Sequence, residues 1–197
     1  QTSGTISFYN RDNKLTAPKI FHNVNNRDLG DVVQSMYFHN DLAYIIVNNS
    51  NKIEVADAIT FEEKAQITGF NLPRYIMPVS DSKAYVSEWG SDGLSGQLSI
   101  LDLNTNSITN TIPVSGGPEH LYFKNGKLYI AHIGGYSTNN IITIINTTTD
   151  QIENTIQVQD RPGAIVDDMD GNLWVACAGK IIYSNYPAID SANSTES

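Results

Sequence analysis

The sequence predicts an all-β fold built from repeated four-stranded sheets, and three observations support this prediction. An apolar strand centred on an aromatic residue recurs with spacings of 41, 44 and 45 residues, at Tyr44, Tyr85, Tyr129 and Trp174. A second strand pattern that ends in Asp or Asn recurs with steps of 47, 45 and 44 residues, at 6–10, 53–57, 98–102 and 142–146. No stretch shows the apolar period of a helix. Repeats of this kind are typical of a β-propeller of four-stranded antiparallel blades.

The repeats divide the chain into three complete blades and two partial ones. The complete blades are expected at about 31–70, 71–116 and 117–160. If the strands of a blade are lettered A to D from the axis outward, residues 1–30 supply C and D, and residues 161–190 supply A and B. We expect one propeller domain over residues 1–190 and a flexible tail over 191–197. Pro18–His22 is read as a D strand, and Ile181–Tyr183 as a further C strand.

The number of blades in the native ring has two interpretations. The N-terminal C and D strands and the C-terminal A and B strands can share one blade, which gives a closed ring of four blades. Alternatively, the chain is part of a larger, seven-bladed ring. An open arc would expose one blade face at each end, and an exposed apolar face favours self-association.

The turns also have a recognisable chemistry. Asn125-Gly126 and Asp170-Gly171 are expected to join strands A and B through tight two-residue turns, because these dipeptides favour positive φ values. Four residues that end the repeated C strand are expected to accept hydrogen bonds from their own turns. They are Asn10, Asp57, Asp102 and Asn146.

Composition limits the function classes. With 12 basic and 21 acidic residues, the formal charge is −9, and an acidic surface disfavours nucleic acid. No run is long enough for a transmembrane segment. The single cysteine, Cys177, lies in an apolar run and is expected to be buried. The chain starts at Gln1, which suggests a trimmed or mature chain.

The motifs resemble those of a known family. Pro-x-x-hydrophobic, Tyr-Val-Ser or Tyr-Ile-Ala, and Ile-x-Val-x-Asp are similar to the YVTN-repeat β-propellers. Residues 29–36, 43–50 and 73–87 more narrowly resemble propeller surface lipoproteins of Gram-negative envelopes, over about residues 4–180. The resemblance implies an extracytoplasmic location at the cell envelope or surface, and a lipid anchor in the full-length protein. Some of those relatives bind cobalamin for an outer-membrane transporter, so the implied partners are a corrinoid-like ligand or an outer-membrane protein.

Propeller ligands usually bind over the axis, on the face formed by the D-to-A connections and the B-to-C loops. Polar and aromatic residues in these loops suit a flat polar ligand or a protein partner. The candidate ligand-binding residues are Arg74, Glu88, Trp89, Glu119, His120, His132, Tyr136 and Arg161. The alternative is that they are ordinary loop residues, with Trp89 and Tyr136 covering the ends of their own blades.

The sequence supports a catalytic or metal site less well than a ligand-binding surface. Glu88, Glu119, His120 and His132 could be assembled into a metal site like that of propeller lactonases, but they lie on two blades and share no ligand spacing. Asp168-x-Asp170-Gly171 resembles part of a calcium loop, but Val166 and Cys177 occupy positions that need oxygen ligands. No catalytic residues, metal or cofactor are predicted. The expected function is non-enzymatic binding at the axial face, with a metal-dependent hydrolase or lactonase, or a structural surface or adhesion module, as the alternatives.

Overall fold

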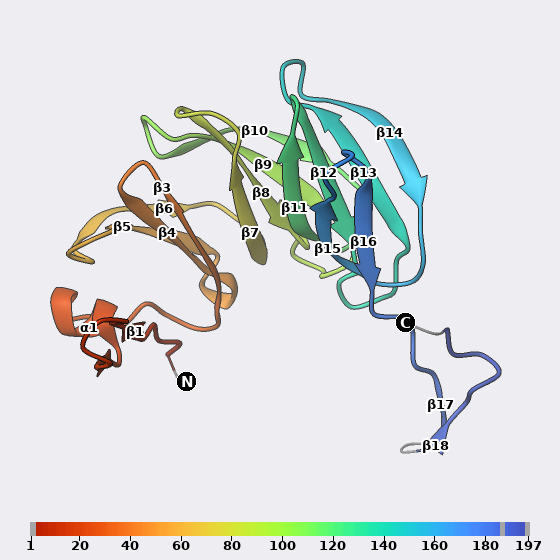
Figure 1. The fold of residues 1–197 in the computed structure, drawn as a ribbon, viewed down its shortest axis with the longest axis horizontal. Coiled ribbons are helices and arrows are strands. Elements are labelled where there is room, and N and C mark those ends of the chain that lie inside the picture. The colour runs from red at the N-terminus through yellow and green to blue at the C-terminus, as the bar shows by residue number, and fades with distance from the viewer. Residues whose placement is uncertain (1–2, 186–187, 196–197) are drawn as a thin grey trace. The chain divides into compact units, whose positions relative to one another are not determined.

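The computed structural model describes residues 3–185 and 188–195 of the chain, and β-strands dominate them (Figure 1). The chain divides into two compact units. Unit 1 contains residues 1–86 and 100–110, and unit 2 contains residues 87–99 and 111–197. The predicted all-β architecture of four-stranded antiparallel blades is confirmed.

The first complete sheet lies in unit 1, with the strand order β3-β4-β5-β6. Its elements are β3 (Val33–His39), β4 (Leu42–Val47), the 3-10 turn η1 (Asn48–Ser50), β5 (Lys52–Asp57) and β6 (Glu63–Thr68). The turn between β3 and β4 is tight because Asn40 and Asp41 have φ values of 47° and 58°. Such a turn matches the twist of the two strands that it joins.

The second sheet has the order β10-β9-β8-β7, and its residues belong to both units. Its strands are β7 (Pro73–Pro78), β8 (Lys83–Glu88), β9 (Gln97–Asp102) and β10 (Ser107–Pro113). Proline lacks a backbone donor, and it is found here at strand ends. Pro73 begins β7, and Pro113 ends the outermost strand β10, where the missing donor costs little.

Sheets stack face to face within unit 1. Side chains alternate across a strand, so Tyr44 and Ile46 of β4 share one face of the first sheet. This face packs on the side chains of Ile76, Ala84 and Val86. All five side chains are at most 3% exposed. Full burial of an aliphatic side chain contributes roughly 1.5–3 kcal/mol, so this packing supplies much of the stability of unit 1.

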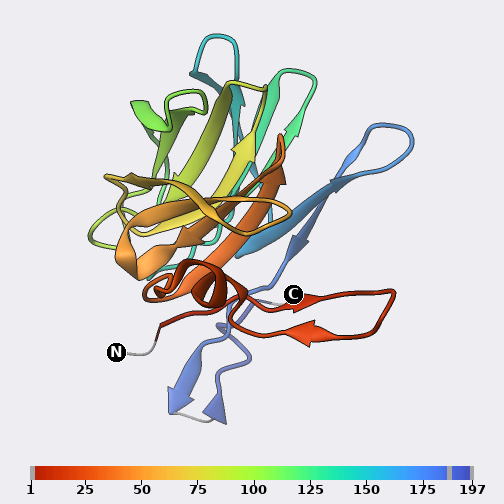
Figure 2. The ribbon, with the colours of Figure 1, turned by 90° about the vertical axis from the view of Figure 1, so that its left-hand side faces the viewer.

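The N-terminal segment differs from the prediction. β1 (Phe8–Tyr9) and β2 (Thr16–Ala17) form a small hairpin, but Ile20–Asn25 is helix α1, so the D strand predicted at Pro18–His22 is wrong (Figure 2). The helical turn buries Phe21 against the opposite face of the first sheet, where Ala43 and Ile45 lie. Tertiary burial of Phe21 therefore outweighs the local β pattern.

Unit 2 contains the third complete sheet, with the order β11-β12-β13-β14. Its strands are β11 (Pro118–Lys124), β12 (Lys127–His132), β13 (Ile141–Asn146) and β14 (Gln151–Gln157). A two-stranded sheet of β15 (Pro162–Asp167) and β16 (Leu173–Cys177) packs on it. Ile165 and Val175 form that contact with Ala131 and Ile142. Unit 2 thus repeats the face-to-face stacking of unit 1.

The C-terminal strands pair differently from the prediction. β17 (Tyr183–Asn185) pairs with β18 (Ala188–Ile189), whereas the predicted C strand at 181–183 should have joined β16. Thr195 is bonded to Lys180 through an isolated bridge. The predicted flexible tail includes residues 196 and 197, which lie outside the described residues.

Most of the turn chemistry follows the sequence. Asn125 and Gly126 both have positive φ values, 51° and 74°, as the prediction of a two-residue turn requires. The turn at Asp170-Gly171 differs from the prediction, because the Gly171 N–H donates a hydrogen bond to the Asp168 carbonyl. The side chain that accepts hydrogen bonds from the backbone of this turn is Asp168, not Asp170. Cys177 is half-buried, so the prediction of a buried thiol is also corrected.

All four predicted turn-capping residues are confirmed. Asp57 Oδ1 accepts hydrogen bonds from the N–H groups of Ile59 and Thr60 at 3.0 and 2.9 Å. Asn10, Asp102 and Asn146 accept equivalent bonds from residues two or three positions onward. The repeated Asp or Asn therefore marks a turn and not a catalytic carboxylate.

Candidate functional site

Three of the predicted residues meet in unit 2 and form the candidate site. Trp89 follows β8, Glu119 lies in β11, and Tyr136 lies in the loop between β12 and β13. The Trp89 indole N–H donates a hydrogen bond of 2.9 Å to Glu119 Oε2. The rings of Trp89 and Tyr136 meet edge to face, with centroids 5.8 Å apart and an interplanar angle of 79°. We call these residues the aromatic cluster.

The exposure of the cluster is graded from inside to outside. Glu119 is 6% exposed, Trp89 is half-buried, and Tyr136 is 72% exposed. The backbone carbonyl of Glu119 also accepts a bond of 2.8 Å from the Ser87 hydroxyl, which is buried. The inner residues hold one edge of the indole, and the outer tyrosine presents its ring to solvent. This arrangement offers an aromatic surface with a fixed polar edge.

Glycines allow the two loops of the cluster to approach closely. Gly93 has φ +68°, and a Cβ at this position would lie 2.2 Å from the Tyr136 ring. A Cβ on Gly135 would lie 2.2 Å from the Gly93 carbonyl oxygen. The Tyr136 N–H donates to that same carbonyl at 3.0 Å. Only glycine fits both the backbone conformation and the space at these positions.

Asp92 orders the first of these loops. Its Oδ1 accepts from the N–H groups of Leu94 and Ser95, both at 2.8 Å, and from the Ser95 hydroxyl at 2.7 Å. The bonds from Ser95 and Leu94 lower the pKa of Asp92 to about 2. The carboxylate therefore stays ionised and capped at physiological pH, which keeps the loop next to Tyr136 in one conformation.

Two predicted residues are fully buried. Glu88 is 0% exposed and accepts hydrogen bonds from the Ser99 hydroxyl and from Gln97 Nε2. His132 is also 0% exposed, and its Nδ1 lies 2.9 Å from the Ser115 carbonyl oxygen, so Nδ1–H donates that bond. Its Nε2 has no hydrogen-bond partner. Neither side chain belongs to the surface that a ligand would meet first.

Burial controls the charge state of His132. Removal of the ring from water lowers the pKa of His132 to about 4, despite the bonds to the backbone of Ser115 and Gly116 that favour the charged form. The imidazole is thus neutral at pH 7. It acts as a buried hydrogen-bond donor between β12 and the connection that precedes β11.

The remaining predicted residues are Arg74, His120 and Arg161. Arg74 is in β7 and belongs to unit 1, where its carbonyl accepts a bond of 2.6 Å from the Ser35 hydroxyl. His120 is half-buried in β11. Arg161 precedes β15 with φ +57°, and its N–H donates to the Asn139 carbonyl at 2.8 Å.

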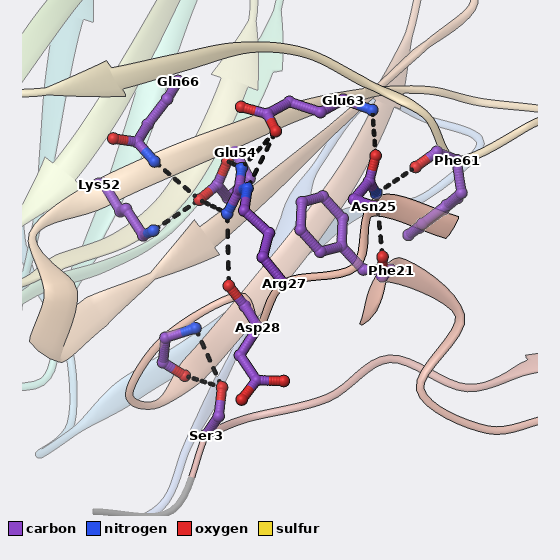
Figure 3. A network of polar contacts seen from close by, with 11 residues as sticks. Ser3, Phe21, Asn25, Arg27, Asp28, Lys52, Glu54, Phe61, Glu63 and Gln66 are labelled. Atoms are coloured by element: carbon purple, nitrogen blue, oxygen red, sulfur yellow. Dashed lines mark hydrogen bonds and ion pairs between the residues drawn. The ribbon is translucent and has the colours of Figure 1, made fainter. Parts of the chain in front are cut away.

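A buried charge network in unit 1 was missed by the sequence reasoning (Figure 3). Glu54 of β5 is 0% exposed, and both of its oxygens accept from the Arg27 guanidinium, at 3.0 and 2.7 Å. Lys52 Nζ and Gln66 Nε2 approach Glu54 Oε1 at 2.6 and 3.0 Å. Arg27 also pairs with Glu63 at 2.8 Å. The carboxylate is therefore surrounded by donors.

The network keeps Glu54 ionised. Burial acts to raise the pKa of Glu54, but the hydrogen bonds from Arg27 and Lys52 outweigh it and hold the pKa below its usual value. One sequence signal could have revealed the site. Glu54 occupies the position that Ser99 and Thr143 occupy in the next two repeats, and both of those residues are buried. A carboxylate at a buried position needs cations beside it.

A cleft of about 270 Å³ lies next to this network. Its lining residues are Ser3, Asp28, Leu29, Gly30, Asp31, Ser50 and Lys52. The Ser3 hydroxyl lies within hydrogen-bond distance of both the N–H and the carbonyl of Gly30, and Asp28 pairs with His22 at 2.8 Å. Most of its lining residues are polar, but Ser3 and Asp28 already bond to the Gly30 backbone and to His22.

Within residues 3–185 and 188–195, no three His, Cys, Asp or Glu side chains are grouped so that they could hold a metal ion. No helix in the part of the chain that the structure describes is long and apolar enough to cross a membrane.

Repeated four-stranded antiparallel sheets, packed face to face on neighbouring sheets, define a β-propeller, and solved structures support this class. Hydrazine synthase of Kuenenia stuttgartiensis matches with TM-score 0.59 and 17% identity over 74% of this chain and 42% of that chain. The WD40 β-propeller domain of Doa1 matches with TM-score 0.59 and 12% identity over 76% of this chain and 48% of that chain. The designed Ika4 protein matches with TM-score 0.57 and 13% identity over 75% of this chain and 91% of that chain. These identities support the fold alone.

The chain belongs to the family described as domain of unknown function DUF5074, whose model matches residues 1–194. No curated protein matches it closely enough to count as a relative. The chain spans less than half the length of the hydrazine synthase and Doa1 structures that it resembles.

Proposed function

We propose that this protein is a non-enzymatic, extracytoplasmic binding protein whose propeller loops hold a flat ligand against the aromatic cluster. The observation that carries the proposal is the packing of exposed Tyr136 on Trp89, whose indole is fixed by nearly buried Glu119. Ordered loops hold these rings in place before a ligand arrives. A preorganised aromatic surface loses little conformational entropy on binding.

The resemblance to YVTN-repeat surface lipoproteins supports the cellular part of the proposal. It favours a position at the cell envelope and a lipid anchor in the full-length protein. It also makes a corrinoid the first ligand class to test, because a corrin ring is flat and carries amide groups at its edge. An outer-membrane protein that binds the same loops is the partner that this resemblance suggests.

Binding is tested by titrating cyanocobalamin and cobinamide into the protein and following the fluorescence of Trp89. A Trp174→Phe background isolates this signal, since the chain has two tryptophans. Trp89→Ala, read by calorimetry, and Tyr136→Ala should each weaken binding at least about tenfold, the usual effect of removing an aromatic anchor. Ile152→Ser, on the outer strand β14, is the matched control. Equal affinity in Tyr136→Ala and the control would contradict the site, and no binding of either corrinoid would contradict the ligand class.

The alternatives make different predictions. A metal-dependent hydrolase or lactonase should bind a divalent ion in stoichiometric amount and lose activity with a chelator. A structural surface or adhesion module should bind its partner through other surfaces, so Tyr136→Ala should leave adhesion unchanged.

A further inference from the structure

The loop between β12 and β13 carries Tyr136, and this loop is closed at its base. The Asn139 N–H donates a hydrogen bond of 3.3 Å to the Ile133 carbonyl. The residues between these two positions therefore form a compact excursion with Tyr136 at its middle. We call residues 133–140 the tyrosine loop. The position of the Tyr136 ring depends on how the base of this loop is held.

The side chain of Asn139 holds this base against the connection that precedes β11. Its Nδ2 donates hydrogen bonds to the Ser115 hydroxyl at 2.8 Å and to the Gly116 carbonyl at 3.0 Å. The Ile133 N–H donates a third bond, of 2.9 Å, to the Gly117 carbonyl. Three successive residues of the connection therefore bond to the two ends of the tyrosine loop.

Asn139 also joins a third segment to these two. Its carbonyl accepts the bond of 2.8 Å from the Arg161 N–H, in the connection that precedes β15. All three segments belong to the loops from which the sequence predicted a ligand-binding face, and Arg161 was one of the predicted residues. Asn139 was not predicted, because its side-chain partners lie 23 and 24 positions away in the sequence.

The middle of the tyrosine loop has fewer restraints than its base. The Tyr136 N–H donates to the Gly93 carbonyl at 3.0 Å, and the ring packs edge to face on Trp89. The rest of the Tyr136 ring faces solvent, with an exposed fraction of 72%. Packing restrains a side chain of such high exposure only weakly, so the hydrogen bonds at the base limit how far the loop can pivot.

We propose that Asn139 is the positioning residue of the ligand site. It holds the tyrosine loop where Tyr136 packs on Trp89, and it acts through Tyr136 instead of on the ligand. The consequence for ligand affinity rests on the proposed function, whereas the position of the ring does not. A loop that is ordered before the ligand arrives binds more tightly, because less conformational entropy is lost on binding.

Asn139→Leu tests the position of the ring without a ligand. In a Trp174→Phe background, Trp89 emission should shift to the red and acrylamide should quench it more strongly, because the Tyr136 ring no longer stays on the indole. In a Tyr136→Ala background, Asn139→Leu should add no further shift. An asparagine that stabilises the fold by a separate route would add its own shift in both backgrounds.

Asn154→Leu is the matched control. Asn139 Oδ1 accepts from the N–H of the next residue at 2.9 Å, and Asn154 Oδ1 on β14 does the same at 2.8 Å. Both substitutions therefore remove the same local bond, and only Asn139→Leu also removes the two bonds to the connection. Asn154→Leu should leave Trp89 emission and quenching unchanged.

Titration with cyanocobalamin measures the effect on affinity. Asn139→Leu should raise the dissociation constant by at least about fivefold, the effect of losing two modest hydrogen bonds that favour the bound conformation. In a Tyr136→Ala background it should change the dissociation constant by less than about twofold, because residues that act through one another do not add. If the parent binds neither cyanocobalamin nor cobinamide, the proposed ligand class fails, and Trp89 fluorescence still decides the role of Asn139.

Ser115→Ala is a milder variant that keeps the test valid if Asn139→Leu does not fold, which circular dichroism checks. It removes one of the two side-chain bonds and leaves the bond to the Gly116 carbonyl, so Trp89 emission should shift in the same direction by a smaller amount. Trp89 emission and quenching that are the same in Asn139→Leu and Asn154→Leu would overturn the proposal. Equal effects of Asn139→Leu with and without the Tyr136 side chain would overturn it as well.

Discussion

The Trp89 indole N–H donates its hydrogen bond to a Glu119 carboxylate that is 6% exposed, and this bond of 2.9 Å fixes the inner edge of the aromatic cluster. A hydrogen bond to a charged group contributes about 1.5–3 kcal/mol, more than a bond between neutral groups. The indole orientation therefore depends on a carboxylate that comes from a different strand.

Glu119→Gln should loosen Trp89 without removing its packing. We expect the free energy of unfolding to fall by about 1–2 kcal/mol, because a neutral acceptor replaces a charged one. In a Trp174→Phe background, Trp89 emission should shift to the red and acrylamide should quench it more strongly. Asp92→Asn serves as a comparison, since Asp92 orders the adjacent loop and does not bond the indole. Identical emission in Glu119→Gln and the parent would contradict the assigned role.

His132 should make stability depend on pH. Its pKa is lowered to about 4 by burial, whereas an exposed histidine in the unfolded chain titrates near about 6.5. The unfolded state therefore binds more protons between these values, and stability falls as pH drops from about 6.5 to 4. The shift corresponds to about 3 kcal/mol over the whole window.

Urea unfolding of the parent and of His132→Gln at pH 7, 6 and 5 measures this effect. The parent should lose about 2 kcal/mol between pH 7 and 5, and His132→Gln should lose clearly less over the same interval. Matching slopes for the two proteins would show that His132 is not the titrating group.

Glu54→Gln should be strongly destabilising at pH 7. It leaves Arg27 and Lys52 beside a neutral group in a buried position, and breaking a buried pair typically costs about 3–5 kcal/mol. Because Arg27 is partly exposed to solvent, we expect Glu54→Gln to lower the free energy of unfolding by about 3 kcal/mol, at the lower end of this range. Glu63→Gln is the matched control because Glu63 also pairs with Arg27 but its side chain is 38% exposed, and it should cost less than about 1 kcal/mol.

The pH dependence of this pair of variants gives a further check. The folded-state pKa of Glu54 is lowered, so its contribution is present above the unfolded pKa and is lost as pH falls through the folded value. The difference in free energy of unfolding between the parent and Glu54→Gln should therefore become smaller as the pH is lowered. A difference that grows as pH falls would contradict an ionised Glu54.

Gly117→Ala and Gly126→Ala separate backbone strain from steric clash. Both glycines have positive φ, +64° and +74°, and alanine in that region costs roughly 1–2 kcal/mol. A Cβ on Gly126 meets nothing within 4 Å, but a Cβ on Gly117 would lie 1.9 Å from the Gly135 backbone nitrogen. We expect Gly117→Ala to lower the free energy of unfolding by about 1–3 kcal/mol more than Gly126→Ala does, as measured by urea unfolding. Equal costs would mean that the two loops are not in contact.

The sequence by itself determined the repeated strands and much of the turn chemistry. Strand formation depends on alternating apolar residues, and each turn depends on the Asp or Asn at the end of a strand. Both effects involve residues only a few positions apart, so the sequence alone predicts them. Asn125-Gly126 formed the predicted turn, and Asp57 capped its own turn. The residues of the aromatic cluster were also named from the sequence, because each lies just beyond or within a strand whose position the repeats indicate.

Only the tertiary structure decided which of these side chains are exposed and which charges are paired. Glu88 and His132 are buried because a neighbouring strand or connection covers them, which no local pattern encodes. Arg27 and Glu54 are 27 residues apart and meet through folding. Residues 20–25 became helical because Phe21 gains more from burial on the first sheet than from the β pattern around it. Packing between distant segments sets solvent exposure, and solvent exposure sets charge, pKa and access to a ligand.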